Sequence, residues 1–187
     1  MNRLLVGVTG QRNPTTKAVT HLISQELNLI NINMRQPFHD VLAAVTGLTS
    51  QNAALLPATQ KINELKCTVA AFERSFFAAI YELNTNYFTD VAALRLERSI
   101  AGFTETLQNI FGGHVISGIS RPAEADFIRN RGGIMVHVKH GEGWPDFHPL
   151  STNATDIIVD SNTLNLNDRK AIADLMKKID TANKEAA

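Results

Sequence analysis

Short apolar runs alternate with segments of helical periodicity along most of the chain. The first run, Leu4 to Val8, is rich in branched residues and is typical of a strand buried on both faces. Similar runs follow at Leu29 to Ile32, His114 to Ser120, Ile134 to Val138 and Asp156 to Asp160. Apolar residues at intervals of three and four lie between the runs and predict helices. This alternation predicts an α/β fold with a mostly parallel sheet covered by helices.

Capping residues, prolines and glycines set the limits of the expected helices. Thr15 or Thr16 caps the first helix, which should end near Asn28. Pro37 suits the first turn of the next helix, and Gly47 suits its end. Further helices are expected after residues 49–52, with an apolar pattern from Leu65 to Leu83, then over 92–110 and 122–128, and from Asn167 or Asp168 onward.

Composition restricts the classes of function. The chain has 187 residues, 44% of them hydrophobic and 19% charged, and no repeat or linker divides it. We therefore expect one domain over residues 1–187. The formal net charge is zero, which gives no strong signal for binding nucleic acid or an acidic membrane. No apolar run reaches membrane-spanning length, and the N-terminus lacks the pattern of a signal peptide.

Cysteine usage predicts a reducing compartment, such as the cytoplasm. Cys67 is the only cysteine, so no disulfide can form within the chain. It lies in an apolar context that reads as helical. We therefore expect it to be a small core residue rather than a nucleophile.

The turn after the first strand has the frame of a phosphate-binding loop. In such a loop, glycines let backbone N–H groups approach phosphate, a Lys reaches the outer phosphates, and a Ser or Thr hydroxyl holds Mg²⁺. When G-x-x-x-x-G-K-[ST] is laid on the chain from Gly7, its second Gly falls on Arg12, its Lys on Asn13 and its hydroxyl residue on Pro14, with Thr15 following directly. The motif alone leaves two interpretations open: an ordinary strand-to-helix turn, or a phosphate loop that has lost catalytic parts.

Longer patterns carry a family resemblance. Residues 7–15 read G-V-T-G-Q-R-N-P-T, residues 35–48 read R-Q-P-F-H-D-V-L-A-A-V-T-G-L, and residues 115–133 read V-I-S-G-I-S-R-P-A-E-A-D-F-I-R-N-R-G-G. In this order they resemble G-x-x-G-S-G-K-D-T, A-D-P-L-K-E-I-L…T-G-L and V-I-S-D-V-R-F-P-N-E-A-E-x-I-R-x-x-G-G of the phage-type deoxynucleoside monophosphate kinases. Residues 156–164 are similar to that family's last strand, D-Y-V-I-x-N-x-G-T-L. Together these segments span nearly the whole chain.

The resemblance implies a three-layer P-loop kinase-like fold. It also implies transfer of phosphate from ATP, with Mg²⁺, to a deoxynucleoside monophosphate bound beside residues 35–48. A phage-encoded member would act in the host cytoplasm. Carried over position by position, the resemblance assigns nucleotide binding to Gly7, Gly10, Arg12, Asn13, Thr15 and Thr16, and catalysis to Arg12, Thr15 and Arg121.

The departures from the family fall on charged positions. Asn13 stands where the loop Lys is expected, and Gly118 stands where an Asp would orient the metal. Ser120 stands where an Arg is expected, although Arg121 is adjacent. Phosphoryl transfer depends on Lys, Arg and Mg²⁺ around the moving phosphate, so losing two or three such charges should leave little activity.

Three functional hypotheses follow. The favoured one is a catalytically impaired relative that acts by binding a nucleotide or a protein partner, with ATP and Mg²⁺ bound weakly or not at all. The second is an active nucleoside monophosphate kinase with a rearranged site that uses Arg12, Thr15 and Arg121. The third is a structural or regulatory protein that binds no nucleotide.

Other charged and aromatic groups have simpler interpretations. Arg121, Arg129 and Arg131 could line the phosphate side, but arginines gathered on one helix more often face solvent. No metal site is expected at His137, His140 and His148, because strand geometry points the first two to opposite faces and no cysteine or tight carboxylate cluster joins them. A homodimer is expected if the outer face of the helix that carries Phe72 to Phe77 is also apolar.

Overall fold

The computed structural model describes residues 3–10, 14–102, 110–139, 150–162, 164–166 and 168–186. The chain divides into two compact units. The sheet unit comprises Met1–Asn33 and Ala92–Ala187, and the helical unit comprises Met34–Val91. That they form one domain over residues 1–187 stays a prediction. Among the described helices, none has the length and apolar character needed to cross a bilayer.

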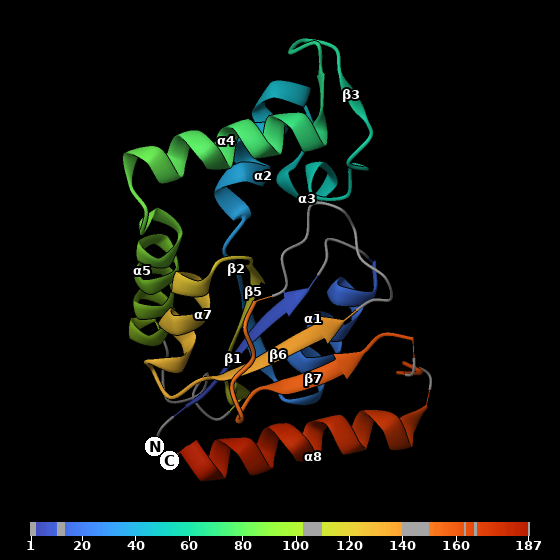
Figure 1. The fold of residues 1–187 in the computed structure, drawn as a ribbon, viewed down its shortest axis with the longest axis vertical. Helices are drawn as coiled ribbons and strands as arrows, with labels where there is room; N and C mark the ends of the chain where they lie inside the picture. The colour runs from blue at the N-terminus through green and yellow to red at the C-terminus, as the bar shows by residue number, and fades with distance from the viewer. Residues whose placement is uncertain are drawn as a thin grey trace. The chain divides into compact units, whose positions relative to one another are not determined.

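The sheet unit is built on a five-stranded parallel sheet. Its strands are β1 (Leu4–Gly10), β2 (Leu29–Asn33), β5 (Gly113–Ile119), β6 (Ile134–Lys139) and β7 (Ile157–Asp160). They lie in the order β2-β5-β1-β6-β7, with every neighbouring pair parallel (Figure 1). Numbered within this sheet, the order is 2-3-1-4-5, which differs from the dinucleotide-binding order 3-2-1-4-5-6 and the flavodoxin-like order 2-1-3-4-5. The expected α/β class with a mostly parallel sheet is confirmed.

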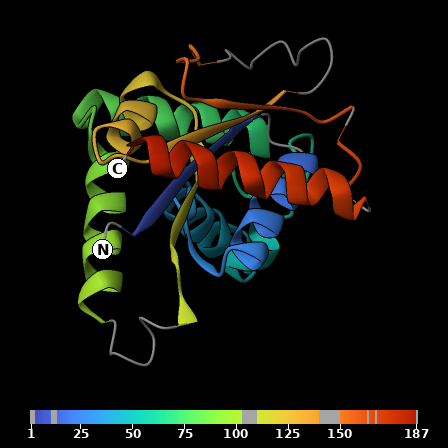
Figure 2. The same cartoon turned by 90° about the horizontal axis from the view of Figure 1, so that it is seen from below.

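Helices α1 (Pro14–Glu26) and α8 (Arg169–Ala186) cover one face of the sheet (Figure 2). Alternate residues of the strands point to this face, as strand geometry requires. They form one aliphatic cluster with both helices. Its members include Val6, Val8, Val115, Val136 and Val159 from the strands, Val19 and Ile23 from α1, and Leu175 and Ile179 from α8.

Helices α5 (Tyr87–Ala101) and α7 (Pro122–Arg129) lie against the opposite face. The approach of α7 is close at Gly7: a Cβ there would lie 2.5 Å from Met135 Sδ and 2.9 Å from Ile128 Cγ1. Helix α5 contributes a polar contact, in which Ser99 Oγ lies 2.8 Å from His114 Nε2. The sheet is therefore covered by helices on both faces.

The helical unit has an aromatic core. It contains α2 (Gln36–Thr46), α3 (Ser50–Ala53), the hairpin β3 (Lys61–Ile62) and β4 (Cys67–Thr68), α4 (Val69–Leu83) and the start of α5. Phe38 is fully buried, and its ring centroid lies 5.6 to 5.8 Å from those of Phe72, Phe76 and Phe77. Rings at these separations pack favourably beyond the apolar area that they bury.

The middle of the chain differs from the expected long helix. Leu65 lies in the turn of the β3–β4 hairpin, and α4 begins only at Val69, where Thr68 Oγ1 accepts a hydrogen bond from the N–H of Ala71 at 3.2 Å. Cys67 pairs with Ile62, so the expectation of a helical context for it was wrong. The helical spacing of apolar residues extended into the residues before this cap, because a two-residue strand is too short to show the period of a strand. The next helix, α5, begins at Tyr87 rather than Ala92.

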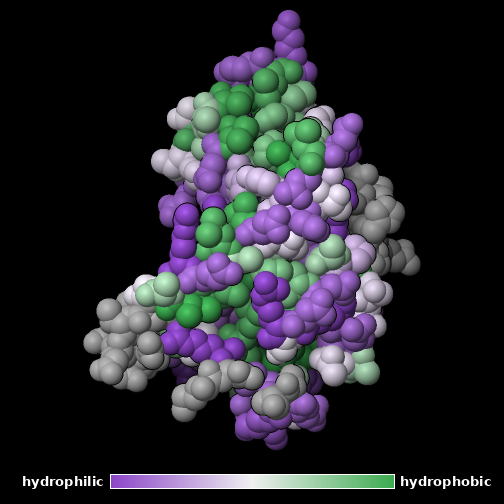
Figure 3. All heavy atoms as spheres, turned by 90° about the vertical axis from the view of Figure 1, so that its left-hand side faces the viewer, coloured by the Kyte–Doolittle hydropathy of each residue, from purple (hydrophilic) through white to green (hydrophobic). Residues whose placement is uncertain are grey.

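The outward side of α4 is mixed in character. Arg74, Ser75 and Glu82 are exposed there, and Leu83 is 84% exposed at the helix end. Apolar side chains also reach the surface elsewhere, as the green areas of Figure 3 show. The homodimer stays a prediction.

Candidate functional site

The carboxyl ends of β5, β1 and β6 form the edge where open α/β sheets bind ligands. β1 ends at Gly10, and the chain then continues to β2, which lies on one side of β1 in the sheet. From β6, the neighbour of β1 on the other side, the chain continues to β7, farther in the opposite direction. Such a divergence between adjacent strands is a topological switch point. Gly10 and the first turn of α1, with Thr15 and Thr16, lie at this point.

Gly10 allows two elements to pack closely at this edge. A Cβ on Gly10 would lie 2.8 Å from Thr16 Oγ1 and 2.9 Å from the carbonyl oxygen of Val138. Both separations are too short for a real Cβ, so the position requires glycine. The Thr16 hydroxyl oxygen is buried, whereas Thr15 is half-buried.

The other predicted site residues are distributed unevenly. Arg12 and Asn13 lie outside the described residues, and their roles stay predictions. Gly7 lies inside β1, where Met135 and its neighbours fill the space beside it. Arg121 is exposed, immediately before α7. The structure therefore brings Gly10, Thr15 and Thr16 together and places Gly7 in the packed interior.

Strand β5 carries a bulge at the same edge. Val8 pairs with Ser117 but Thr9 pairs with Ile119, so Gly118 is the extra residue of β5. Its φ of 80° lies in the left-handed region, which favours glycine. Thr9 Oγ1 donates a buried hydrogen bond of 2.8 Å to the carbonyl oxygen of Ile119. This bond holds β5 beyond the bulge.

The backbone N–H groups after β5 point toward the carboxylate of Glu124. One carboxylate oxygen, Oε2, accepts hydrogen bonds from the N–H groups of Ser120 at 2.7 Å and Arg121 at 3.1 Å. Glu124 is only 3% exposed and lies in the first turn of α7, where a negative charge is favourable. N–H groups that donate to this carboxylate are not available to a phosphate.

A buried charged cluster lies under α7. Asp156 Oδ2 accepts hydrogen bonds from Arg129 Nη2 at 2.5 Å, from His137 Nε2 at 2.9 Å and from the N–H of Asn153 at 2.9 Å. The side chain of Asp156 is 1% exposed, and that of Arg129 is 15% exposed. Arg129 Nη2 also donates to the carbonyl oxygen of Ser151. The expectation that Arg129 faces solvent was therefore wrong.

Protonation states follow from burial and hydrogen bonding. Burial alone would raise the pKa of Asp156, but hydrogen bonds from Arg129, Asn153 and His137 outweigh it and lower that pKa. Burial lowers the pKa of His137, and the hydrogen bond to Asp156 opposes this only in part. Near neutral pH, Asp156 is ionised and a neutral His137 donates from Nε2. The cluster ties residues 151–156 to β6 and α7.

Little in the sequence could have revealed this cluster. Asp156 lies 19 residues from His137 and 27 from Arg129, so no short motif connects the three. In the described part of the chain, no group of three or more His, Cys, Asp or Glu residues is arranged to hold a metal ion. His140 and His148 lie outside it. Neither the family models nor the curated proteins compared with this chain match it.

Proposed function

We propose that this chain is a degenerate relative of the phage-type deoxynucleoside monophosphate kinases that keeps the frame of a nucleotide site but not its phosphoryl-transfer chemistry. It acts by binding a nucleotide or a protein partner. The succession of β1, a glycine-containing turn and α1 at a switch point of a parallel sheet supports the frame. The groups around that frame support the loss of chemistry.

The conformation of Gly118 carries the proposal. The sequence resemblance implies an Asp at this position, where it would orient Mg²⁺. Gly118 is instead the extra residue of a bulge, with φ of 80°. An Asp in this conformation would incur backbone strain of about 1 to 2 kcal/mol. The backbone at this edge suits glycine and disfavours the family's carboxylate.

Four features reduce what a triphosphate could use. The Thr16 hydroxyl is buried against Gly10, and the N–H groups of Ser120 and Arg121 donate to Glu124. Pro14, the first residue of α1, has no N–H to offer. Asn13 supplies no charge where the family has Lys. All these differences weaken ATP binding in the same direction.

Calorimetry and a coupled kinase assay test the proposal. The wild-type protein should bind ATP–Mg²⁺ weakly or not at all, with no turnover of the common deoxynucleoside monophosphates. The triple variant Arg12→Gly, Asn13→Lys and Pro14→Asp should raise ATP affinity without turnover, because Gly118 and Ser120 remain. The exposed substitution Lys178→Gln on α8 is the matched control. Equal ATP affinity of the wild type and the triple variant would contradict this account of the loop.

A second candidate function is an active kinase that uses Arg12, Thr15 and Arg121. The exposure of Arg121 directly after the β5 edge favours it. Clear turnover by the wild type that is lost in Arg12→Ala, and kept in Lys178→Gln, would establish this function and overturn the first. If the protein binds none of ATP, GTP and the deoxynucleoside monophosphates, only the proposed binding of a protein partner would remain.

A further inference from the structure

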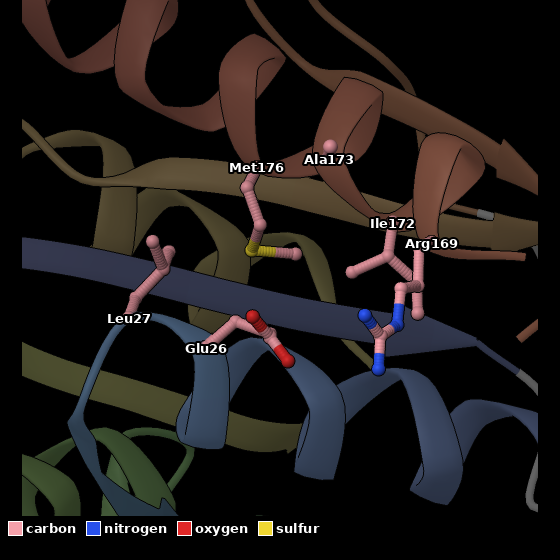
Figure 4. A pocket seen from close by; sticks show the side chains of 6 residues that line it. All are labelled: Glu26, Leu27, Arg169, Ile172, Ala173 and Met176. Carbon is pink, nitrogen blue, oxygen red and sulfur yellow. The ribbon is translucent and has the colours of Figure 1, made fainter. Parts of the chain in front are cut away.

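A groove of about 600 Å³ lies in the sheet unit between the end of α1 and the first turns of α8. Glu26 and Leu27 line it from the α1 side, and Arg169, Ile172, Ala173 and Met176 line it from α8 (Figure 4). It is at the end of α1 away from Gly10, and it is independent of the proposed nucleotide site. Its volume falls within the range of small-molecule sites in proteins.

The floor of the groove is apolar. Leu27 and Met176 are partly buried and pack against the aliphatic cluster beneath α1 and α8. Ile172 is also half-buried, and Ala173 adds no polar atom. An apolar ligand body lying on this floor would remove apolar surface from water on both sides, which is favourable. Met176 has a flexible thioether that can adapt to such a body.

Two opposite charges flank this floor. Figure 4 shows the carboxylate of Glu26 and the guanidinium of Arg169 directed into the space between the helices. Neither forms an ion pair or a side-chain hydrogen bond with another described residue. Both charges are therefore available to a ligand.

The positions of these charges are unfavourable for the helices that carry them. Glu26 is the last residue of α1, where the helix dipole disfavours a negative charge, and Arg169 is the first residue of α8, where it disfavours a positive one. The N-terminus of α8 is capped without Arg169, because Asp168 Oδ1 accepts from the N–H of Lys170 at 2.9 Å. Charges that disfavour the helix that carries them, with no compensating local contact, are typical of functional positions.

We propose that this groove binds a small zwitterionic ligand with an apolar body, of the class of α-amino acids with large apolar side chains. The ligand's ammonium group lies beside Glu26, its carboxylate beside Arg169, and its apolar body on Leu27 and Met176. A ligand with only a negative charge would be repelled by Glu26, and one with only a positive charge by Arg169. Charge complementarity therefore selects a ligand that carries both.

Methyl NMR of the full chain tests the proposal with three probes that share the leucine side chain and differ at the charged groups. The probes are L-leucine, N-acetyl-L-leucine, which lacks the ammonium charge, and L-leucinamide, which lacks the carboxylate. L-leucine should shift the methyl signals of Leu27, Ile172 and Met176, and should bind about fivefold more tightly than either derivative. Glu26→Gln and Arg169→Gln should each weaken L-leucine binding by about the same factor. Lys178→Gln and Glu185→Gln, exposed charges elsewhere on α8, should leave it unchanged.

Three outcomes would overturn the proposal. Equal binding of the three probes would show that charge does not select the ligand. Absence of any shift at millimolar L-leucine would exclude this ligand class. Methyl shifts that depend on protein concentration without a probe would assign the groove to a second copy of the chain. Unchanged thermal unfolding of the four variants shows that any loss of binding does not come from misfolding.

Discussion

The two faces of the parallel sheet bury different chemistry. The face under α1 and α8 is lined by branched aliphatic residues such as Val6, Val136 and Val159. The layer under α5 and α7 contains the buried polar residues Thr9, His114, Glu124 and His137, and the side chain of Asp156. Hydrophobic burial has no direction and holds whole layers together. Hydrogen bonds are directional and hold particular segments in place.

Each polar contact of the α7 layer fixes one irregular segment. Thr9 holds β5 beyond the Gly118 bulge, and Glu124 holds residues 120 and 121. Asp156 accepts a hydrogen bond from the N–H of Asn153, and its partner Arg129 donates to the carbonyl oxygen of Ser151. Two of these segments lie at the carboxyl edge of the sheet, where the candidate site is. The aliphatic face should therefore determine overall stability, whereas the polar layer should also determine the geometry of this edge.

Removing Asp156 should have the largest effect. Asp156→Ala removes the buried carboxylate that Arg129 and His137 share. Because the Arg129 charge then loses its buried partner, the free energy of unfolding should fall by about 4 kcal/mol. Urea unfolding at pH 7 measures the change. Asp126→Ala is the control, because Asp126 pairs with the same Arg129 but is 58% exposed, and should cost less than about 1 kcal/mol. Equal costs for the two variants would show that burial of the pair contributes nothing.

Truncating a side chain on the aliphatic face should have the next largest effect. Ile179 is fully buried in α8, and Ile179→Ala should cost about 3 kcal/mol through lost burial and the cavity left behind. No titratable group is lost, so this cost should be the same at pH 4 and pH 7 in urea unfolding. The neighbouring exposed substitution Lys178→Ala should be nearly neutral. A cost of Ile179→Ala that varies with pH would contradict the proposed division between the faces.

Loss of Glu124 should have a smaller effect on stability. Glu124→Ala removes a charged acceptor of the Ser120 and Arg121 N–H groups and should cost about 2 kcal/mol. Glu124→Gln keeps an acceptor oxygen and should cost less. Backbone NMR should show shifts at residues 118–121 in the Ala variant. Unchanged shifts there would mean that Glu124 does not position this edge.

The smallest effect near neutral pH should come from the buried histidines. Burial lowers the pKa of His114, with Arg3 adding to the effect, and burial also lowers the pKa of His137. The unfolded chain therefore binds more protons than the folded one below about pH 6.5, so stability should fall as pH decreases from that value. The double variant His114→Gln and His137→Gln should lose this slope in thermal unfolding, whereas Ile179→Ala should keep it. An unchanged slope in the double variant would mean that groups other than His114 and His137 cause the pH dependence of stability.

Much of the fold could be predicted from the sequence, because the relevant signals are local. Branched apolar runs predicted both ends of β5 and β6 within one residue, and those of β1 within two. Pro37 and Gly47 predicted the limits of α2, and Gly47 has the left-handed φ of 68° typical of a helix end. Gly10 was expected in the turn between the first strand and the helix that follows, and it is the last residue of β1.

Only the tertiary structure decided which of these elements meet and which polar groups they bury. Strand order, the bulge at Gly118, the unavailable N–H groups beside Glu124 and the cluster at Asp156 have no local pattern. The Thr9–Ile119 hydrogen bond joins residues 110 positions apart, and Asp156, the residue before β7, contacts His137 of β6 and Arg129 of α7. Such pairs depend on how whole elements pack, because a strand's periodicity says which side is buried but not which neighbour covers it.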